Sequence, residues 1–273
     1  MLQVEVSVMQ PSEKDEIKNR VRAQFGSTAP AYSRSLVHSD PGALGKVVEL
    51  ARPRPGDRAL DVATGAGHTA LALAPHVREV VAYDMTEEML RETERNARAR
   101  GLANVVARKG TAEELPFPDS TFDIVTVRQA PHHFADVEAA LREMARVAKT
   151  GARVVIVDST SPEDLSLDRQ WNEIEKLRDP SHVRNYRPSE WRAMVAGAGL
   201  HVTSEELDHC MENGRPMNFE VWVRRMHASP EAVATLRQIF RTASPALAQA
   251  LRIGIEGEEL SFCVPQIWIA AVK

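Results

Sequence analysis

The sequence contains only two cysteines in 273 residues, and it has no long uninterrupted hydrophobic run. No apolar stretch approaches the roughly 20 residues that a membrane-spanning helix needs, and residues 1–10 do not have the pattern of a signal peptide. We therefore expect no membrane span. Cys210 and Cys263 could pair in principle, but so sparse a cysteine content is typical of a cytoplasmic chain with reduced core thiols, and we expect that state.

A surplus of basic residues is also absent, since 34 Lys and Arg face 38 Asp and Glu and the formal net charge is −4. Binding to a nucleic-acid backbone depends on clustered positive charge, so we expect no nucleic-acid partner. The sequence has no cluster of His, Cys and Asp with metal-ligand spacing, no P-loop and no Gly-x-Ser-x-Gly motif. We accordingly expect no metal site.

The most informative stretch runs from Ala59 to Thr69 and reads Ala-Leu-Asp-Val-Ala-Thr-Gly-Ala-Gly-His-Thr. Its apolar start is typical of a buried strand, the two glycines indicate a loop, and an alanine-rich helix follows. Glycines at this point let the backbone approach a ligand closely, although dinucleotide-binding dehydrogenases share the pattern. Asp61 would repel a pyrophosphate. It suits a ligand with an ammonium group and no phosphate, such as S-adenosylmethionine (SAM).

A second apolar run, residues 80–84, also ends in an acid, Asp84. A carboxylate at the end of this strand lies where the ribose hydroxyls of a bound nucleoside are held. The two acids therefore predict a nucleoside site at one edge of a sheet.

The spacing Asp61-x-Ala63-x-Gly65-x-Gly67, together with Asp84 and the stretch Gly-Thr-Ala-Glu-Glu-Leu-Pro-Phe-Pro-Asp-Ser-Thr-Phe-Asp at 110–123, resembles class I SAM-dependent methyltransferases. It is most similar to the ubiquinone/menaquinone-biosynthesis C-methyltransferases and their small-molecule relatives. The resemblance covers residues 21–159 well and the remainder in outline. It implies S-adenosylhomocysteine (SAH) as the product and the following cofactor-binding residues: Tyr32, Asp61, Ala63, Gly65, Ala66, Gly67, Asp84, Met85, Thr111, Ala112, Glu113 and Arg128.

The family often has Asp or Asn where this chain has Thr111, so we expect the adenine contacts to come from backbone groups of Ala112 and Glu113. Arg128 closes a predicted strand beside the methyl-transfer centre. Its guanidinium could hold an acidic substrate, or its backbone alone could line the cofactor.

His132 and His133 are the candidate catalytic bases because they follow that same strand. A histidine's ordinary pKa suits removal of a proton from a phenol or an activated carbon acid. The alternative is that the pair only forms hydrogen bonds to the backbone. His182 could contact the substrate, although a solvated loop is the simpler interpretation.

Strand and helix patterns alternate through the first part of the chain, as in crossover units of a parallel sheet. We predict strands at 58–63, 79–84, 105–109, 123–128 and 153–158, and helices at 41–51, 69–75, 86–100 and 136–147. Beyond these we predict helices at 167–177 and 188–199, a strand at 202–210, two or three helical stretches within 217–251, and a closing strand at 260–272. The resemblance implies an α/β fold: a doubly wound, seven-stranded, mostly parallel Rossmann-like sheet with its last strand antiparallel and with helical lid insertions.

We expect a single domain over residues 1–273, with the cofactor-binding core at about 43–160 and substrate-side helices at about 161–200 and 212–257. The N-terminal segment, about 17–42, is expected to be a lid: a helix over 17–25, then a breaker-rich stretch from Gly26 to Tyr32. Alternatively, Phe25 and Tyr32 only pack on the core. Residues before Glu16 are expected to be a loose tail.

The sequence thus predicts a methyltransferase that transfers a methyl group from SAM to oxygen or carbon of a small-molecule acceptor. Two alternatives stay open: an NAD-dependent oxidoreductase, and a SAM-binding protein without transferase activity. The identity of the acceptor and the oligomeric state are not determined by the sequence.

Overall fold

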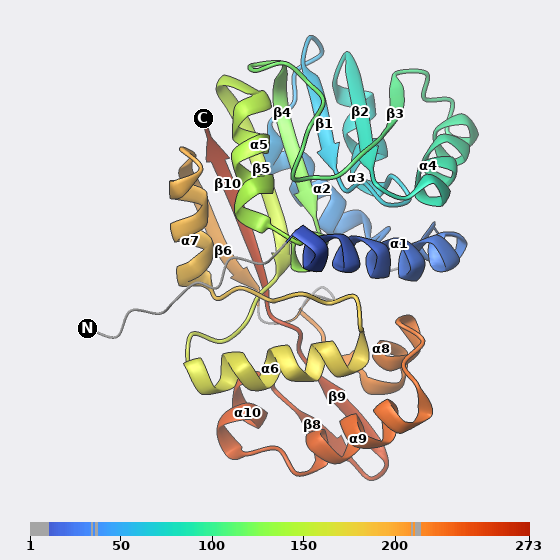
Figure 1. Cartoon of the computed structure of the whole chain (residues 1–273), viewed down its shortest axis with the longest axis vertical. Coiled ribbons are helices and arrows are strands. Elements are labelled where there is room, and N and C mark those ends of the chain that lie inside the picture. Colours follow the sequence, from blue (N-terminus) through green and yellow to red (C-terminus); the bar gives the residue numbers. More distant parts are fainter. Residues whose placement is uncertain (1–10, 34, 36–37, 209, 211–213) are drawn as a thin grey trace.

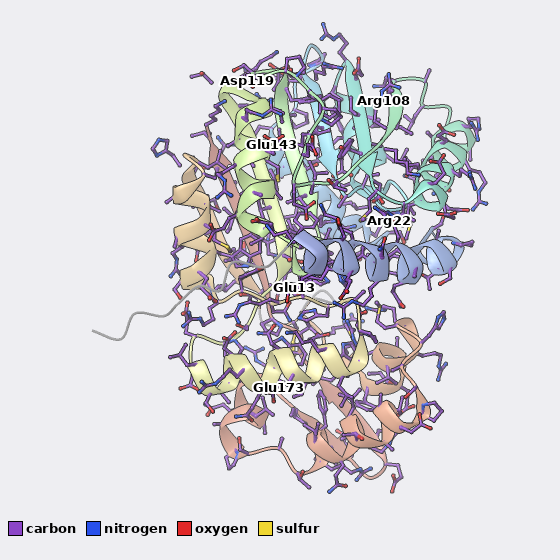
Figure 2. The ribbon with its side chains drawn as sticks, in the orientation of Figure 1. Glu13, Arg22, Arg108, Asp119, Glu143 and Glu173 are labelled. Atoms are coloured by element: carbon purple, nitrogen blue, oxygen red, sulfur yellow. A yellow bond between two sulfur atoms is a disulfide. The ribbon has the colours of Figure 1, made fainter. Side chains whose placement is uncertain are left out.

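The computed structural model of the chain describes residues 11–33, 35, 38–208, 210 and 214–273. Figure 1 shows a large sheet with helices on both faces above a smaller lobe that contains α6 (Leu165–Arg178), with α1 (Pro11–Ser33) between them. Figure 2 marks Glu13 and Arg22 on α1 and Glu173 on α6, and both helices run across the view, with α1 above α6.

The large sheet has seven strands in the order β3-β2-β1-β4-β5-β10-β6. Their bounds are β1 Arg58–Val62, β2 Glu79–Asp84, β3 Val105–Lys109, β4 Phe122–Arg128, β5 Ala148–Ser159, β6 His201–Asp208 and β10 Gln266–Val272. The first five strands pair in parallel, whereas β10 runs antiparallel to both β5 and β6. The predicted doubly wound, mostly parallel sheet with an antiparallel last strand is confirmed.

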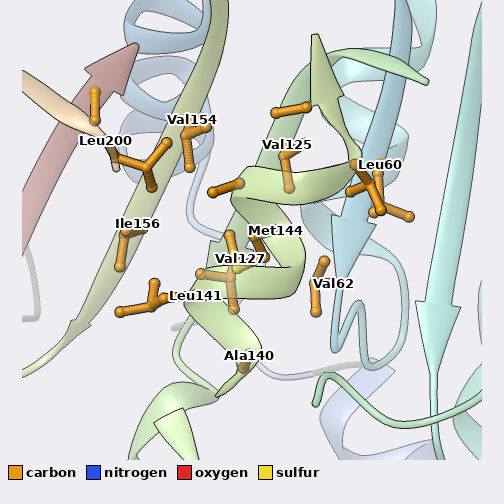
Figure 3. Close-up of a cluster of buried hydrophobic side chains, with 14 of the residues drawn as sticks. Leu60, Val62, Val125, Val127, Ala140, Leu141, Met144, Val154, Ile156 and Leu200 are labelled. Carbon is orange, nitrogen blue, oxygen red and sulfur yellow. The ribbon is translucent and has the colours of Figure 1, made fainter. Parts of the chain in front are cut away.

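Side-chain alternation along the strands supplies an apolar layer on each face of the sheet. On one face, residues such as Leu60, Val62, Val125 and Val127 pack with Leu141 and Met144 of α5 (Val137–Val147), as Figure 3 shows. Helix α7 (Pro188–Gly197) adds Trp191 and Val195 to the same layer. The opposite face is covered by α2 (Pro41–Ala51) and α3 (His68–Leu73), followed by the short helix η1 (Ala74–His76).

The helix after β2 is α4 (Glu87–Ala99), and a short helix η2 (Pro131–His133) lies between β4 and α5. The Asp136 side chain caps α5 by accepting the Ala139 backbone N–H at 2.8 Å. Strand β5 begins at Ala148, five residues before the predicted start, because Ala148 pairs with Phe122 beyond an irregularity in the ladder.

The expected break after Phe25 is wrong. Helix α1 continues through Gly26 and Pro30, and it also includes residues 11–16 of the expected tail, whose first ten residues lie outside the described part. Tertiary packing outweighs the weak local propensity: Ala29 is buried against Ala66 and Met89. Positions 34, 36 and 37 of the expected lid segment also lie outside the described residues.

The expected single closing strand is also wrong. Residues 259–262 form β9 (Glu259–Phe262) in a separate antiparallel sheet, ordered β7-β9-β8, with β7 (Met217–Asn218) and β8 (Gly254–Glu256). Only the stretch after Pro265 joins the large sheet as β10. The small sheet packs with α6 and with three helices, α8 (Phe219–Arg225), α9 (Pro230–Arg241) and α10 (Pro245–Ala250), around an aromatic core containing Trp222, Phe240 and Phe262.

The expectation of two free thiols is likewise wrong. Cys210 and Cys263 form a disulfide, with their Cα atoms 4.4 Å apart. Cys210 lies two residues beyond β6, and Cys263 lies in the short connection from β9 to β10. The fold brings together two positions that are 53 residues apart in sequence, which no local pattern indicates.

Candidate functional site

A cavity lies at the edge of the sheet where β1, β2 and β4 end, and α1 forms its outer wall. It encloses about 980 Å³ of space free of protein atoms, part of it open to solvent. Eleven of the predicted site residues line it: Tyr32, Asp61, Ala63, Gly65, Ala66, Asp84, Met85, Ala112, Glu113, Arg128 and His133. Gly67, Thr111 and His132 are not among its lining residues.

Asp61 is buried at the end of β1, where three donors hold its carboxylate. The Thr64 and Thr126 hydroxyls donate to it at 2.6 and 2.7 Å, and the Ala70 backbone N–H donates at 3.1 Å. Burial still outweighs these bonds and raises the pKa of Asp61 to about 6. The carboxylate is therefore fixed in position, and a positive charge beside it would stabilise its ionised form.

Asp84 bridges the two loops that follow β1 and β2. Its carboxylate accepts the backbone N–H groups of Gly65 and Thr86, both at 2.8 Å. Burial raises its pKa as well. Each carboxylate oxygen keeps a lone pair for a further donor, because an ionised carboxyl group has about four acceptor positions.

The two glycines of the loop have different surroundings. Gly65 has φ +55°, and a Cβ added there would meet nothing within 4 Å. The backbone at Gly65 therefore faces open space in the cavity. A Cβ on Gly67, at φ +87°, would lie 2.7 Å from the Thr93 side chain. Gly67 thus allows α4 to pack against the loop, whereas Gly65 leaves room for a ligand.

Arg128 holds the wall of the cavity together. Its Nε donates to the Thr69 hydroxyl at 3.1 Å, and its Nη2 donates to the His38 carbonyl at 2.6 Å. Burial lowers its pKa to about 10. Its guanidinium therefore connects α3 to the segment that precedes α2.

A second cavity adjoins the first and encloses about 510 Å³ of space free of protein atoms. The two cavities share Tyr32, His38, Gln129 and His133, so these four residues form their common border. The small lobe supplies the far wall, which includes Arg178, Trp222 and Arg225. His132 and His182 also line this second cavity.

His132 is paired with a buried acid. Its Nδ1 lies 2.6 Å from Oδ1 of Asp158, and its backbone N–H donates to Oδ2 of the same carboxylate at 2.8 Å. Because a carboxylate only accepts, Nδ1 carries the proton and Nε2 of the neutral ring is the basic nitrogen. Burial alone lowers the pKa of His132, but the Asp158 charge and hydrogen bond outweigh it and the net shift is upward.

His133 has a different environment. Its Nδ1 donates to the Ser181 carbonyl at 3.0 Å, and its ring stands edge-on to Phe25 at 4.9 Å between centroids. Burial, followed by the neighbouring His132, lowers its pKa to about 3, so its ring is neutral at pH 7. The backbone hydrogen bond that the sequence offered as the alternative for this pair is thus present at His133.

The solvated-loop interpretation of His182 is wrong, because only 5% of this residue is exposed. Asn172 Oδ1 accepts the Asn185 backbone N–H at 2.6 Å and lies 3.3 Å from His182 Nε2. An amide oxygen accepts only, so Nε2 of His182 carries the proton and Nδ1 is an acceptor. Within the described part of the chain, that Nδ1 has no hydrogen-bond partner.

Sequence reasoning missed His38 and His68, which both line the first cavity. His68 Nε2 donates to the Tyr32 carbonyl at 3.1 Å, which ties the glycine loop to the end of α1. Its place directly after Gly67 was the one available signal. His38 lies beyond α1, where no motif marks it.

The described residues contain no group of three or more His, Cys, Asp or Glu side chains arranged to hold a metal ion. In the same residues, no helix combines the length and apolar character needed to cross a membrane.

Comparison with known proteins gives concordant matches. A family model described as a methyltransferase domain matches residues 53–215. An uncharacterized methyltransferase of Bacillus subtilis, YcgJ, is 37% identical over 251 residues, covering 91% of this chain and 97% of the relative. The ubiquinone/menaquinone biosynthesis C-methyltransferase UbiE of Teredinibacter turnerae is 30% identical over 172 residues, covering 61% of this chain and 69% of the relative.

Two solved structures have the same fold. The crystal structure of YcgJ superimposes with a TM-score of 0.79 and covers 85% of this chain and 98% of its own. A putative methyltransferase from Bacillus halodurans gives a TM-score of 0.80 at 34% identity, covering 85% of this chain and 99% of its own.

Proposed function

The chain belongs to the methyltransferase-domain family, as a class I SAM-dependent methyltransferase, and from that premise we propose that it methylates oxygen or carbon of a small-molecule acceptor. The observation that carries the proposal is the pair of adjoining cavities. One contains the glycine loop and two buried carboxylates, and the other contains a histidine paired with a buried acid.

The first cavity fits SAM in the chemistry of its donors and acceptors. Asp61 would accept the methionine ammonium group, and a positive charge there would compensate the burial that raises its pKa. Asp84 would accept the ribose hydroxyls with its remaining lone pairs. The open space at Gly65 would admit the ligand close to the backbone, and Ala112 and Glu113 would lie against the adenine.

The second cavity would hold the acceptor. When bound, SAM supplies a methyl group on a sulfonium centre, which makes the transfer an in-line displacement that yields SAH. The chain then has to align the acceptor, exclude water and remove a proton. His132 is our proposed base: Nε2 takes the acceptor's proton, and Asp158 stabilises the resulting imidazolium.

His133, the other candidate base, is proposed as a border residue. A ring that stays neutral at pH 7 and is fixed by Ser181 and Phe25 would shape the passage between the two cavities. UbiE of Teredinibacter turnerae is named as a C-methyltransferase, which supports carbon beside oxygen as the acceptor atom.

We further propose that residues 1–273 work as a single domain, with α1 as a lid. The second cavity draws its walls from Tyr32 of the N-terminal segment, from Gln129 and His132 of the core, and from Trp222 of the small lobe. No one part could form it alone. The size of this cavity favours a small acceptor and argues against a nucleic-acid partner.

Two measurements test the proposal. SAM and SAH should raise the melting temperature and NAD should not, because ligand binding to the native state stabilises it. Incubation with SAM and candidate phenols and carbon acids should then release SAH. Stabilisation by NAD alone would contradict the proposal. Stabilisation by SAM without turnover on any acceptor would favour the binding-only alternative.

A further inference from the structure

The border between the two cavities contains a side chain that the rest of the described chain does not bind. Three of the four border residues have a side-chain hydrogen bond within the described part of the chain: Tyr32, His38 and His133. The fourth, Gln129, is half-buried, and its amide group has no hydrogen bond to any described residue. An amide that lines both cavities without a partner has two N–H donors and a carbonyl oxygen for a ligand.

The backbone at Gln129 is held in an unusual conformation. Its φ is +53°, in the left-handed region that residues other than glycine seldom adopt. Strand β5 fixes it there, because the Gln129 N–H donates to the Val157 carbonyl at 2.7 Å. Residues held in this way are concentrated at binding and active sites. A glycine would adopt this φ at no steric cost, so the conformation alone does not account for a glutamine, and its side chain does.

Gln129 and His132 offer complementary groups to the second cavity. Both residues follow β4, and both line that cavity. His132, our proposed base, offers the lone pair of Nε2, whereas the Gln129 amide offers N–H donors. A hydroxyl group satisfies both, since its O–H donates and its oxygen accepts. When its proton passes to Nε2, the electron pair of the O–H bond stays on oxygen, and an N–H donor stabilises the negative charge that results.

Resting on the proposed function, we infer that Gln129 binds the acceptor, which is a phenol or an enol whose oxygen accepts the Gln129 amide N–H while its proton goes to Nε2 of His132. In a phenol, the oxygen keeps a further lone pair for the methyl group. In an enol, the electrons on oxygen pass to the neighbouring carbon, which takes the methyl group instead. A neutral amine nitrogen has a single lone pair, and a bond from the amide N–H would occupy it. Gln129 in this role therefore favours an oxygen acid over an amine.

4-Nitrophenol provides the test, because its neutral and ionised forms absorb at different wavelengths. With the full chain saturated with SAH, a pH titration of the absorbance gives the pKa of the bound phenol. A donor to the oxygen lowers that pKa, so Gln129→Met should raise it by about one unit, which corresponds to about tenfold weaker binding of the ionised form.

Two further variants show which half of the amide acts. Gln129→Glu should raise the pKa of the bound phenol further, because a carboxylate cannot donate and repels the ionised oxygen. Gln129→Asn should recover part of the effect, because asparagine keeps the N–H donors and tolerates the left-handed conformation. An acceptor role of the amide oxygen would instead leave Gln129→Glu close to the unmodified chain.

The matched control is Gln238→Met, which makes the same change at an exposed position of α9 and should leave the titration unchanged. An unchanged pKa in Gln129→Met or Gln129→Glu, or no binding of 4-nitrophenol, would overturn the inference. SAH calorimetry separates the two proposals. Normal SAH binding without an effect of the Gln129 variants overturns the role of Gln129 alone, whereas absent SAH binding in the unmodified chain overturns the proposed function.

Discussion

The carboxylate of Asp158 holds His132 at two points, accepting from the ring Nδ1 at 2.6 Å and from the backbone N–H at 2.8 Å. The first bond sets the tautomer, and the second fixes the position of the residue that carries it. The basic Nε2 is thereby left for the second cavity, which His132 lines. Pairing of an imidazole with a buried acid is a common way to orient and strengthen a general base.

The first prediction concerns this pair. Asp158→Asn should lower the pKa of His132, because the negative charge that raises it is removed, and turnover should fall about a hundredfold. The acidic limb of the rate profile should move to lower pH, since a weaker base stays unprotonated further into the acid range. Histidine NMR titration can measure the pKa without an acceptor. An unchanged His132 titration in Asp158→Asn would contradict the assignment.

His132→Asn should lose turnover to a similar extent and keep SAM affinity. His133→Asn is the matched comparison, since both rings lie at the same bend in the chain. We expect its effect to fall mainly on KM, because His133 is proposed to shape the passage and not to take a proton. The opposite pattern would make His133 the base.

The second prediction is that Asp84→Ala weakens SAM and SAH binding about tenfold or more, through loss of the charge-assisted bonds to the ribose. Asp84 also holds the Gly65 and Thr86 backbone, so Asp84→Asn is needed beside it. That variant keeps an acceptor oxygen and should lose less affinity. Calorimetry measures both, with the exposed Glu94→Ala on α4 as control. Full affinity in a folded Asp84→Ala variant would refute the ribose role.

The third prediction is a pH dependence of SAH binding. The pKa of Asp61 is raised to about 6, so at pH 5 most free protein carries a neutral carboxyl group there. If the ionised form holds the ligand's ammonium, affinity falls as pH falls through 6, by about tenfold between pH 7.5 and pH 5. Asp61→Asn should bind weakly at both values. Calorimetry showing equal affinity at both pH values in the unmodified chain would exclude the ammonium contact.

The fourth prediction concerns the disulfide between Cys210 and Cys263. Breaking a link that closes a loop of this length removes about 2–4 kcal/mol from the free energy of unfolding. Cys263→Ser should show this loss in urea unfolding, and a reducing agent should produce it in the unmodified chain but not in the variant. Alkylation of the unreduced, denatured chain should label no thiol. Two labelled cysteines under those conditions would favour the free-thiol state.

The fifth prediction concerns the lid. Residues 24–33 belong to α1, and the Tyr32 ring lines both cavities. Hydrogen exchange across Gln24 to Ser33 should slow when SAH binds, because the ligand would lie against the inner side of the helix. Peptides from α9, which lines neither cavity, serve as the internal control. Equal exchange of the α1 segment with and without SAH would rule out a lid.

Local patterns determined the sheet and the first cavity. The apolar runs that end in Asp61 and Asp84 were sufficient to predict that both acids line one site. Parallel strands bring their carboxyl ends to one edge of the sheet, so two acids far apart in sequence meet there. The structure has the predicted bounds for strands 79–84 and 105–109 and for helix 41–51, because short-range periodicity specifies buried strands and amphipathic helices.

Tertiary structure alone decided the second cavity. His132 meets Asp158 across 26 residues, and the far wall of the second cavity comes from helices that precede and follow β6. Contacts between distant segments also decide three other features: the course of α1 through Gly26 and Pro30, the break of the closing strand at Pro265, and the disulfide. Such contacts are set by the packing of the whole chain, and the residues around each position do not encode them.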